Sequence, residues 1–392
     1  MTESQINRAP LPNAELLAQS PVRVVAGAGA LSQLGALAHE LGASRVLLVT
    51  DPGIEKAGHA TRAVESLKSR GIEIVLFDGV HENPTTEHVA AGLKLADGQS
   101  IDVIIGVGGG STMDCAKGIN LLLTNGGEIH DYHGEGKANK PMLPMVVAPT
   151  TAGTGSEAQS FALISDPVTH VKMACGDRRD PREGGLRPHV AILDHELTRS
   201  QPSSVAAASA IDAISHAVET AATNARTKLS QQFSCEAWRL LDRSIEAALS
   251  NPQDDDMRRD MLWGAHFAGA AIEQSMLGAA HACANPLTAK YGIVHGMAVG
   301  IMLPHVVRFN SQAQADVYGS LGLDADSLAN RITHFLNVAH MPDGLAALGV
   351  ERSDLEALAE LAATQWTAKF NPVPVGVEEF KHIYQSALNS AH

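Results

Sequence analysis

Two ionisable residues interrupt an otherwise apolar stretch in the second half of the chain. Residues 205–218 read Val-Ala-Ala-Ala-Ser-Ala-Ile-Asp-Ala-Ile-Ser-His-Ala-Val, and apart from two serines the polar residues are Asp212 and His216. Burying either group without a partner is costly. Four residues apart on a helix, they lie about 5–6 Å from each other on one face, close enough to bind one ion. Taken alone, this spacing more often reflects an Asp–His hydrogen bond inside a core.

Two further histidines stand at the ends of apolar helical patterns. His281 lies in the small, apolar stretch 278–286, and His295 begins the next helical pattern. Singly, each is more often a buried histidine with a hydrogen-bond partner than a ligand. Together with Asp212 and His216 they offer three imidazoles and one carboxylate. This donor set suits Fe²⁺ or Zn²⁺ and leaves room for a substrate oxygen.

Two glycine clusters compete as a phosphate-binding loop. The first, Gly27–Gly29, joins a strand pattern to a helix pattern but lacks the third glycine of a dinucleotide fingerprint. The second, Gly108–Ser111, has three consecutive glycines that let backbone N–H groups approach a pyrophosphate at a helix end. Asp114 and Lys117 follow it on one helix face. We prefer the second cluster, although an ordinary surface helix with exposed charges explains this spacing as well.

Hydroxyl and carboxylate groups follow two other strand patterns. The stretch Thr150–Glu157 comes after a strand that ends at Ala148, and its hydroxyls could bind ribose and phosphate. Asp51 follows the strand 45–50, where its carboxylate could accept from the adenosine ribose and repel a 2′-phosphate. A tight polar turn and a turn aspartate are the alternatives. Because α/β proteins bind ligands at the ends of parallel strands, we interpret both features as cofactor contacts.

The elements that must position these residues alternate between strand and helix patterns in the first half of the chain. Helical patterns at Ala30–Leu41 and His88–Leu95 lie between apolar strand patterns at residues 22–26, 45–50, 72–77, 101–107 and 144–148. This order predicts a parallel, Rossmann-like sheet covered by helices. The charged stretch Asp177–Gly185 is expected to be a solvated loop before a last strand, Val190–Leu193. We therefore predict an α/β dinucleotide-binding domain at 1–195 and an all-helical, metal-binding domain at 196–392.

Length and composition restrict the class of protein. A chain of 392 residues is longer than one hydrophobic core usually organises, and 45% apolar residues exclude a disordered or collagen-like protein. The net charge of −14, without a basic cluster, makes nucleic acid and anionic membranes poor partners. Four isolated cysteines fit a reducing cytoplasm. No segment approaches the ~18 apolar residues of a membrane span.

Taken together, these motifs resemble the iron-containing (group III) alcohol dehydrogenases. The resemblance rests on the Gly108–Ser111 and Thr150–Glu157 loops, on the four metal-ligand candidates and on the following Leu303–Asn310 stretch, and it runs from about Pro21 to the last helix. It implies an NAD-binding α/β domain, a helical domain that holds Fe²⁺ or Zn²⁺, and a cleft between them. The implied activity is the NAD-linked interconversion of a small alcohol and its aldehyde or ketone.

The resemblance also assigns residues. It matches the metal ligands to Asp212, His216, His281 and His295. It matches the cofactor contacts to Asp51, Asn83, Gly108, Gly109, Gly110, Ser111, Asp114, Thr150, Thr151, Thr154 and Lys172. Many family members carry a second histidine four residues after the first, where this chain has Asn285. Because an amide cannot take a proton, we expect Asn285 to position the substrate, with the proton leaving through water or ribose hydroxyls. A homodimer or higher homo-oligomer is expected.

Three rival hypotheses keep part of this interpretation. A hydroxyacid–oxoacid transhydrogenase would share the fold but retain its nicotinamide, so the release of free NADH separates it from a dehydrogenase. A lyase similar to dehydroquinate synthase would need a basic cleft for its phosphate-bearing substrate, and no Lys/Arg cluster lies near the ligand candidates. A metal-stabilised assembly module would bind an ion without hydride transfer, and it leaves the glycine and threonine loops unexplained.

Overall fold

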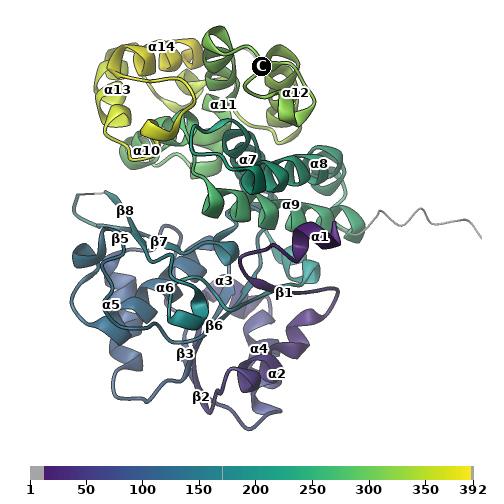
Figure 1. The fold of residues 1–392 in the computed structure, drawn as a ribbon, viewed down its shortest axis with the longest axis vertical. Helices are drawn as coiled ribbons and strands as arrows, with labels where there is room; N and C mark the ends of the chain where they lie inside the picture. The colour runs from purple at the N-terminus through teal and green to yellow at the C-terminus, as the bar shows by residue number, and fades with distance from the viewer. Residues whose placement is uncertain (1–12, 170, 390–392) are drawn as a thin grey trace, which may run out of the picture.

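The computed structural model describes residues 13–169 and 171–389. Within these residues an α/β part is followed by a helical part, and Figure 1 shows the second stacked above the first. The change from sheet to helix falls between residues 193 and 203. The predicted fold class, a parallel α/β region followed by an all-helical region, is confirmed.

Six parallel strands form the main sheet, in the order β1-β9-β6-β4-β2-β3. Their bounds are β1 Arg23–Ala26, β2 Arg45–Val49, β3 Glu73–Phe77, β4 Val103–Gly108, β6 Met145–Pro149 and β9 Val190–Leu193. Strands β4, β6 and β9 are buried along their whole length, as expected of a parallel sheet covered on both faces. Alternate residues of β2 enter different hydrophobic clusters, Val46 and Leu48 in one and Leu47 and Val49 in the other.

In the described part of the chain, one short α-helix precedes β1, and five further α-helices lie between the strands from β1 to β6. Their bounds are α1 Ala14–Leu17, α2 Leu34–Glu40, α3 Pro52–Lys56, α4 His59–Lys68, α5 Thr86–Ala96 and α6 Gly110–Asn125. Because all six strands of the main sheet run in parallel, their carboxyl ends meet at one edge. Asp51, the glycine cluster and Thr150 lie where β2, β4 and β6 end at this edge.

A second, smaller sheet was not predicted from the sequence. It has the order β5-β8-β7, with bounds β5 Gly134–Glu135, β7 Phe161–Ser165 and β8 Lys172–Gly176. Its strands are short, and β7 alternates between buried and half-buried residues instead of forming an apolar run. Lys172, a predicted cofactor contact, is the first residue of β8.

The charged stretch 177–185 is not the solvated loop that the sequence predicts. Asp177 is 2% exposed and accepts hydrogen bonds from the Arg179 guanidinium. The backbone N–H of Leu186 donates to the Asp177 carbonyl, and that of Met142 to Gly184. Ion pairing and backbone hydrogen bonds therefore fold this stretch back onto the α/β part, which composition alone does not reveal.

Eight helices make up the described residues beyond 202. Their bounds are α7 Ser203–Ala222, α8 Lys228–Ser250, α9 Asp255–Gln274, α10 Ala279–Tyr291, α11 His295–Ala313, α12 Ala325–Val338, α13 Leu355–Ala363 and α14 Val377–Leu388. Short 3₁₀ helices are η1 Ala30–Gln33, η2 Ile129–Tyr132, η3 Ser156–Ala158, η4 Pro181–Glu183, η5 His195–Ser200, η6 Gly319–Leu321, η7 Leu345–Leu348, η8 Arg352–Asp354 and η9 Ala368–Phe370. From residue 207, α7 is buried almost all round, as expected of a helix in a protein interior. Across the described residues, no helix combines the length and apolarity needed to span a membrane.

Candidate functional site

A buried cluster brings together the predicted metal ligands. Asp212 and His216 lie one turn apart on α7, His281 lies in the first turn of α10, and His295 is the first residue of α11. The Asp212 Oδ1 atom is 3.4 Å from His216 Nε2 and 3.6 Å from His281 Nε2. The His216 and His281 rings stack with their centroids 4.9 Å apart, and the His295 ring centroid lies 5.4 Å from that of His281. Asp212, His216 and His281 thus form one donor set, whereas the half-buried His295 lies beside the His281 ring and outside this group of three.

Several polar atoms of this cluster have no hydrogen-bond partner among the described residues. They include Asp212 Oδ1 and His281 Nε2, which face each other, and also the Nδ1 atoms of His216 and His295. An unsatisfied buried polar atom is rare in native proteins because it costs about 1–3 kcal/mol. One carboxylate oxygen and imidazole nitrogens within 4.8 Å of one another at Asp212, His216 and His281 suit a divalent ion. The residues present therefore fit a metal.

Burial and neighbouring charges shift the pKa values of all four side chains in the cluster. Burial alone would raise the pKa of Asp212, but the imidazoles of His216, His281 and His295 outweigh it and hold that pKa well below its usual range. Burial would lower the pKa of His281, yet the carboxylates of Glu219 and Asp212 raise it to about 9. Burial lowers the pKa of His216 and His295. Without an ion, the cluster is thus expected to hold a proton at His281 at neutral pH.

Glu219 is a member of the site that the sequence analysis missed. Its Oε2 atom lies 2.5 Å from His281 Nδ1, and its Oε1 atom accepts from the backbone N–H of Ala280 at 2.7 Å. This contact makes Nδ1 the donor and leaves His281 Nε2 facing Asp212, where it can bind an ion once it has lost its proton. The sequence could have indicated this residue, because Glu219 follows His216 by three residues and so falls on the same face of a helix.

The two loops proposed to hold the cofactor lie against each other. A Cβ atom at Gly110 would be 2.5 Å from Thr154 Cγ2, and one at Gly109 would be 3.3 Å from Thr151 Cγ2. The glycines therefore permit this close packing. Among the described residues no side chain caps the N-terminus of α6, so its first backbone N–H groups are available to an anion.

Two of the predicted contacts beside these loops, Ser111 and Asp51, already have hydrogen-bond partners in the protein. The Ser111 hydroxyl accepts from the backbone N–H of Asn83 at 3.2 Å, so these two residues are in contact. Asp51 caps α3 through Oδ1, and its Oδ2 accepts from Thr112 Oγ1 at 3.0 Å. Asp51 thus has a structural role beside the glycine loop, in addition to any contact with ribose.

The backbone N–H groups at the first glycine cluster already have a hydrogen-bond acceptor within the protein. The Asp194 carboxylate accepts from the backbone N–H groups of Gly29 at 3.1 Å and Leu31 at 3.2 Å. Asp194 is buried and also caps η5. These N–H groups are therefore already hydrogen-bonded, which agrees with the preference for the second cluster.

Asp114 and Lys117 are buried instead of facing solvent. Asp114 Oδ1 accepts from Ser156 Oγ at 2.6 Å, and Lys117 Nζ donates to both oxygens of Ser156 and to the carbonyl of Phe161. Burial raises the pKa of Asp114 and lowers that of Lys172, while the charges of Asp114 and Asp212 act on Lys172 in the opposite direction. The Lys172 ammonium thus interacts with a carboxylate of the α6 helix and with one of the metal cluster.

The threonine–glycine loop also joins the α/β part to the helical part. Gly155, with φ of +62°, packs so closely on α9 that a Cβ atom there would be 2.5 Å from Gly269 Cα. Beside it, Glu157 Oε1 lies 3.2 Å from the buried ring of His266. Thr150 accepts through its carbonyl from the Gln201 amide. One loop thus contacts the glycine cluster on one side and the helices on the other.

Asn285 lies one turn after His281 on α10, as predicted. Its Nδ2 atom donates to Gln365 Oε1 at 2.9 Å, and the residue is half-buried. The amide is thus anchored on one side by the segment that follows α13.

Comparisons with known proteins identify similar chains over almost the whole length. The family model for iron-containing alcohol dehydrogenase matches residues 21–195, and that for the C-terminal part of the Fe-containing alcohol dehydrogenase family matches 206–388. Alcohol dehydrogenase 4 of Schizosaccharomyces pombe is 34% identical, covering 92% of this chain and 86% of its own. The NAD-dependent methanol dehydrogenase of Bacillus methanolicus is 30% identical, covering 94% and 98%. A crystal structure of a 1,3-propanediol oxidoreductase superimposes with a TM-score of 0.87 at 32% identity, covering 93% and 98%.

Proposed function

The chain belongs to the iron-containing alcohol dehydrogenase family, and from this premise we propose that it oxidises a small alcohol to its aldehyde or ketone with NAD at the buried cluster. The observation that carries the proposal is the pair Asp212 Oδ1 and His281 Nε2, which lie 3.6 Å apart and lack hydrogen-bond partners in the described part of the chain. A bound metal ion would satisfy both of these buried atoms at once.

Four residues are proposed to hold the metal, namely Asp212, His216, His281 and His295. The family and the donor set favour Fe²⁺, and Zn²⁺ suits the same donors. When bound, the metal acts as a Lewis acid toward the substrate oxygen. The protein keeps the donors in place through the Glu219 contact to His281 and through the helical framework of α7, α10 and α11.

The cofactor is proposed to lie at the carboxyl edge of the main sheet. NAD supplies the hydride acceptor. The uncapped N-terminus of α6 at Gly108–Ser111 binds its pyrophosphate, and Asp51 accepts from the adenosine ribose. The remaining proposed contacts are Asn83, Asp114, Thr150, Thr151, Thr154 and Lys172. Because the Thr150–Thr154 loop touches both the glycine cluster and the helical part, it sets the distance between cofactor and metal cluster.

Asn285 is proposed to orient the substrate. Its Nδ2 atom is held by Gln365, which leaves Oδ1 to accept from a substrate hydroxyl. An amide oxygen does not take the proton, so the proton leaves through water or the ribose hydroxyls.

The proposal also covers the domain boundary, the oligomeric state and the cellular compartment. We place the domain boundary at 195/196, since η5 follows the last strand there and α7 begins at Ser203. Besides the small alcohol or aldehyde, the proposed partner is a second copy of the chain, in a homodimer or a higher homo-oligomer. The proposed compartment is the cytoplasm, which fits four cysteines that are all free.

The test is a screen of short alcohols, diols and hydroxyacids with NAD, using chelated enzyme reloaded with Fe²⁺ or Zn²⁺. We expect free NADH to accumulate with at least one alcohol and only in metal-loaded enzyme. Turnover that requires a 2-oxoacid as second substrate, without free NADH, would favour the transhydrogenase instead. Full activity in enzyme shown to lack metal would contradict the proposal.

A further inference from the structure

Two aromatic rings from the two parts of the molecule stack on each other. Phe161 is the first residue of β7, and Trp366 lies between α13 and η9. Their ring centroids are 6.0 Å apart with an interplanar angle of 25°. Trp366 remains 36% exposed, so the stack lies at the surface and not in the core. Residues 205 positions apart in the sequence thus connect the α/β part to the helical part.

Each ring is held in place on its own side. The Arg178 guanidinium lies over the Phe161 ring, 5.4 Å from its centroid. Gly176, paired with Phe161 across the β7–β8 ladder, leaves the space for the ring, because a Cβ atom there would be 2.2 Å from Phe161 Cε1. On the opposite side, the Phe370 ring contacts Trp366 edge-on at 6.4 Å. The stack is therefore built from both sides and is not an incidental contact of two free side chains.

Both ends of the stack are tied to the proposed site. The carbonyl of Phe161 accepts from Lys117 Nζ at 2.9 Å, and Lys117 lies on α6, which begins with the glycine cluster. Gln365, next to Trp366, accepts from Asn285, which lies one turn from His281. A continuous set of contacts thus runs from the cofactor loops, through the two rings, to the helix that carries a metal-ligand candidate.

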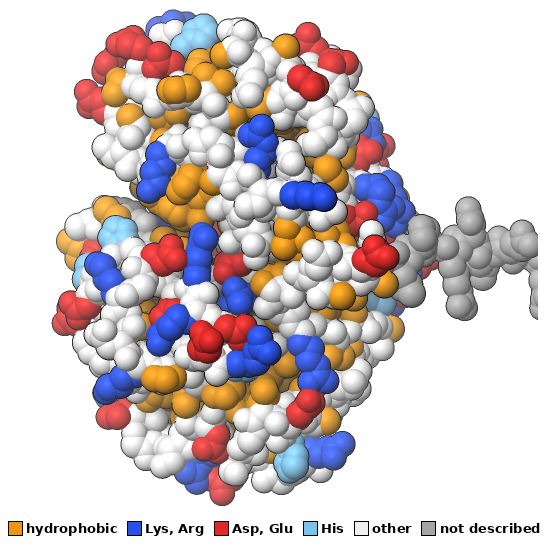
Figure 2. Space-filling model, viewed as in Figure 1, with side chains coloured by type: hydrophobic (Ala, Val, Ile, Leu, Met, Phe, Trp, Pro, Cys, Tyr) orange, Lys and Arg blue, Asp and Glu red, His pale blue; other side chains and the backbone are white. Residues whose placement is uncertain are grey.

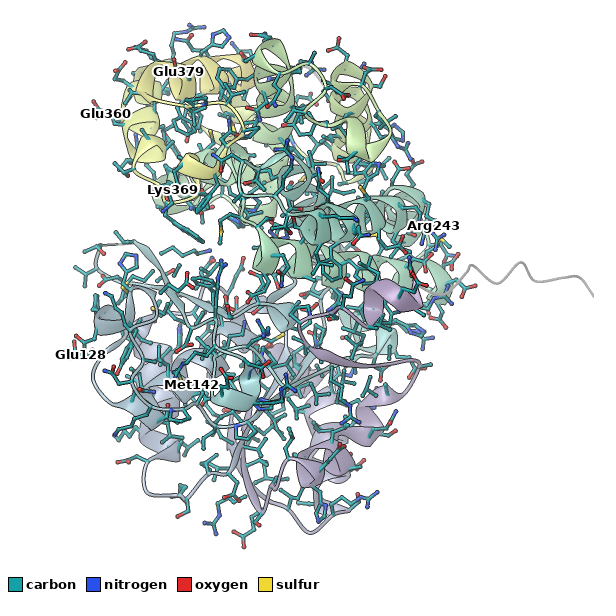
Figure 3. The ribbon with its side chains drawn as sticks, viewed as in Figure 1. Glu128, Met142, Arg243, Glu360, Lys369 and Glu379 are labelled. Atoms are coloured by element: carbon teal, nitrogen blue, oxygen red, sulfur yellow. The ribbon has the colours of Figure 1, made fainter. Side chains whose placement is uncertain are left out.

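The surface is hollowed where the two parts meet. Figure 2 shows a notch between them on the left of the view, with hydrophobic side chains on its upper lip. In Figure 3 the label of Lys369 marks the rim of the helical part that faces this notch. The Lys369 ammonium lies over the Phe370 ring, 5.0 Å from its centroid, and Phe370 in turn contacts Trp366. The aromatic group therefore belongs to this rim.

We propose that Phe161 and Trp366 form a gate that limits the site to short alcohols. This inference rests on the proposed function. The Asn285–Gln365 hydrogen bond places Trp366 next to a residue that contacts the turn after His281, so a carbon chain that extends from the cluster past Asn285 would meet the stacked rings. Because such a chain has to separate the rings, the gate selects by length, whereas a short alcohol leaves the rings in contact.

The test measures kcat/KM over straight-chain alcohols from ethanol to octanol. Trp366→Ala and Phe161→Ala should each raise the octanol-to-ethanol ratio by about tenfold or more, the order of selectivity that apolar contacts give. Because either substitution breaks the same contact, the double variant should gain no more than the single ones. Trp366→Phe, which keeps a stacked ring, should retain the wild-type profile, and so should the control Leu361→Ala on exposed α13 surface. An unchanged profile in both alanine variants, or fully additive gains, would overturn the gate.

A second readout is independent of activity. Trp238 and Trp263 are each 6% exposed, so acrylamide quenching of the native protein reports mainly on Trp366. Phe161→Ala should make this fluorescence more quenchable, and Leu361→Ala should not. Equal quenching in Phe161→Ala and the wild type would show that the rings do not cover each other and would also overturn the gate. A wild-type enzyme that oxidises no alcohol contradicts the proposed function instead, so the two failures are distinguishable.

Discussion

The cofactor loops and the metal cluster differ in how their polar atoms are satisfied. At the carboxyl edge of the sheet, Asp51 caps a helix, Asp114 accepts from Ser156, and Asp194 closes the first glycine cluster. In the helical part, Asp212 Oδ1 and imidazole nitrogens of the cluster lack partners among the described residues. Side chains that already have hydrogen-bond partners are held in place without a ligand, whereas a cluster of unsatisfied polar side-chain atoms is completed by one. Metal removal should therefore affect the helical part more than the α/β part.

The largest effect is expected from His281→Ala. Removing a ligand candidate should abolish turnover and bound metal, while NAD binding by the α/β part should persist because its loops do not depend on the ion. Metal content and NAD binding would both be measured by titration calorimetry on chelated and reloaded protein. His334→Ala on the exposed surface of α12 serves as the control. If His281→Ala retained both bound metal and activity, the claim that the helical part depends on a metal ion at this cluster would be wrong.

Glu219→Gln should weaken metal binding without removing a ligand. Loss of an outer partner of a metal-bound histidine typically costs about 10–100-fold in affinity. The amide can still contact the His281 ring, but it no longer supplies the negative charge that holds the pKa of His281 at about 9. Competition with a chelator measures the change. Glu246→Gln, which alters a carboxylate facing His334 on the surface, is the matched control, and equal affinities in both variants would speak against the role of Glu219.

Asp51→Asn tests the cofactor side of the comparison. Asparagine caps a helix as well as aspartate, so α3 should stay stable, whereas Asp51→Ala should cost about 1 kcal/mol of stability. Without the carboxylate, the preference for NAD over NADP should narrow by about tenfold, or about 1.4 kcal/mol. The measurement is kcat/KM for both cofactors, with Asp324→Asn, another helix cap, as the control. Equal use of NADP and NAD by the wild type would show that Asp51 does not contact the ribose.

The smallest effect is expected at Asn285. Asn285→Ala should lower kcat/KM modestly, and Gln365→Ala, which removes only the anchor of the amide, should lower it less. Asn285→His should preserve activity and add a titration near the ordinary histidine pKa of about 6.5. The profiles of kcat/KM against pH are compared at equal metal content. If Asn285→Ala follows the wild-type profile throughout, this residue does not line the site.

The features that the sequence predicts best are those with a strong contrast to their surroundings. All six strands of the main sheet were predicted, because each carries a short apolar run, and in β4, β6 and β9 this run is buried along its whole length. Asp212 and His216 are conspicuous because the rest of α7 around them is apolar. The family resemblance alone suggested cofactor contacts such as Asn83 and Lys172, because no motif in the sequence marks these two residues.

Features that depend on long-range contacts were missed. Strand β7 alternates between buried and half-buried residues, and it pairs antiparallel with β8, so neither strand belongs to the parallel pattern that the sequence shows. The burial of Lys117 follows from its contacts to Ser156 and Phe161, which lie 39 and 44 positions away. Glu219 had a detectable helical spacing, but its contact to His281 spans 62 positions. Spacing along one element can be read from sequence, whereas contact between elements requires the fold.

Anomalous diffraction from crystals of iron-loaded protein tests the central claim most directly. Our account predicts one strong peak per chain at the iron edge, within coordination distance of Asp212, His216, His281 and His295, and no peak in crystals of His281→Ala grown with the same metal. A peak at another position, or crystals of active enzyme with no peak between these four side chains, would contradict the assignment of the metal site.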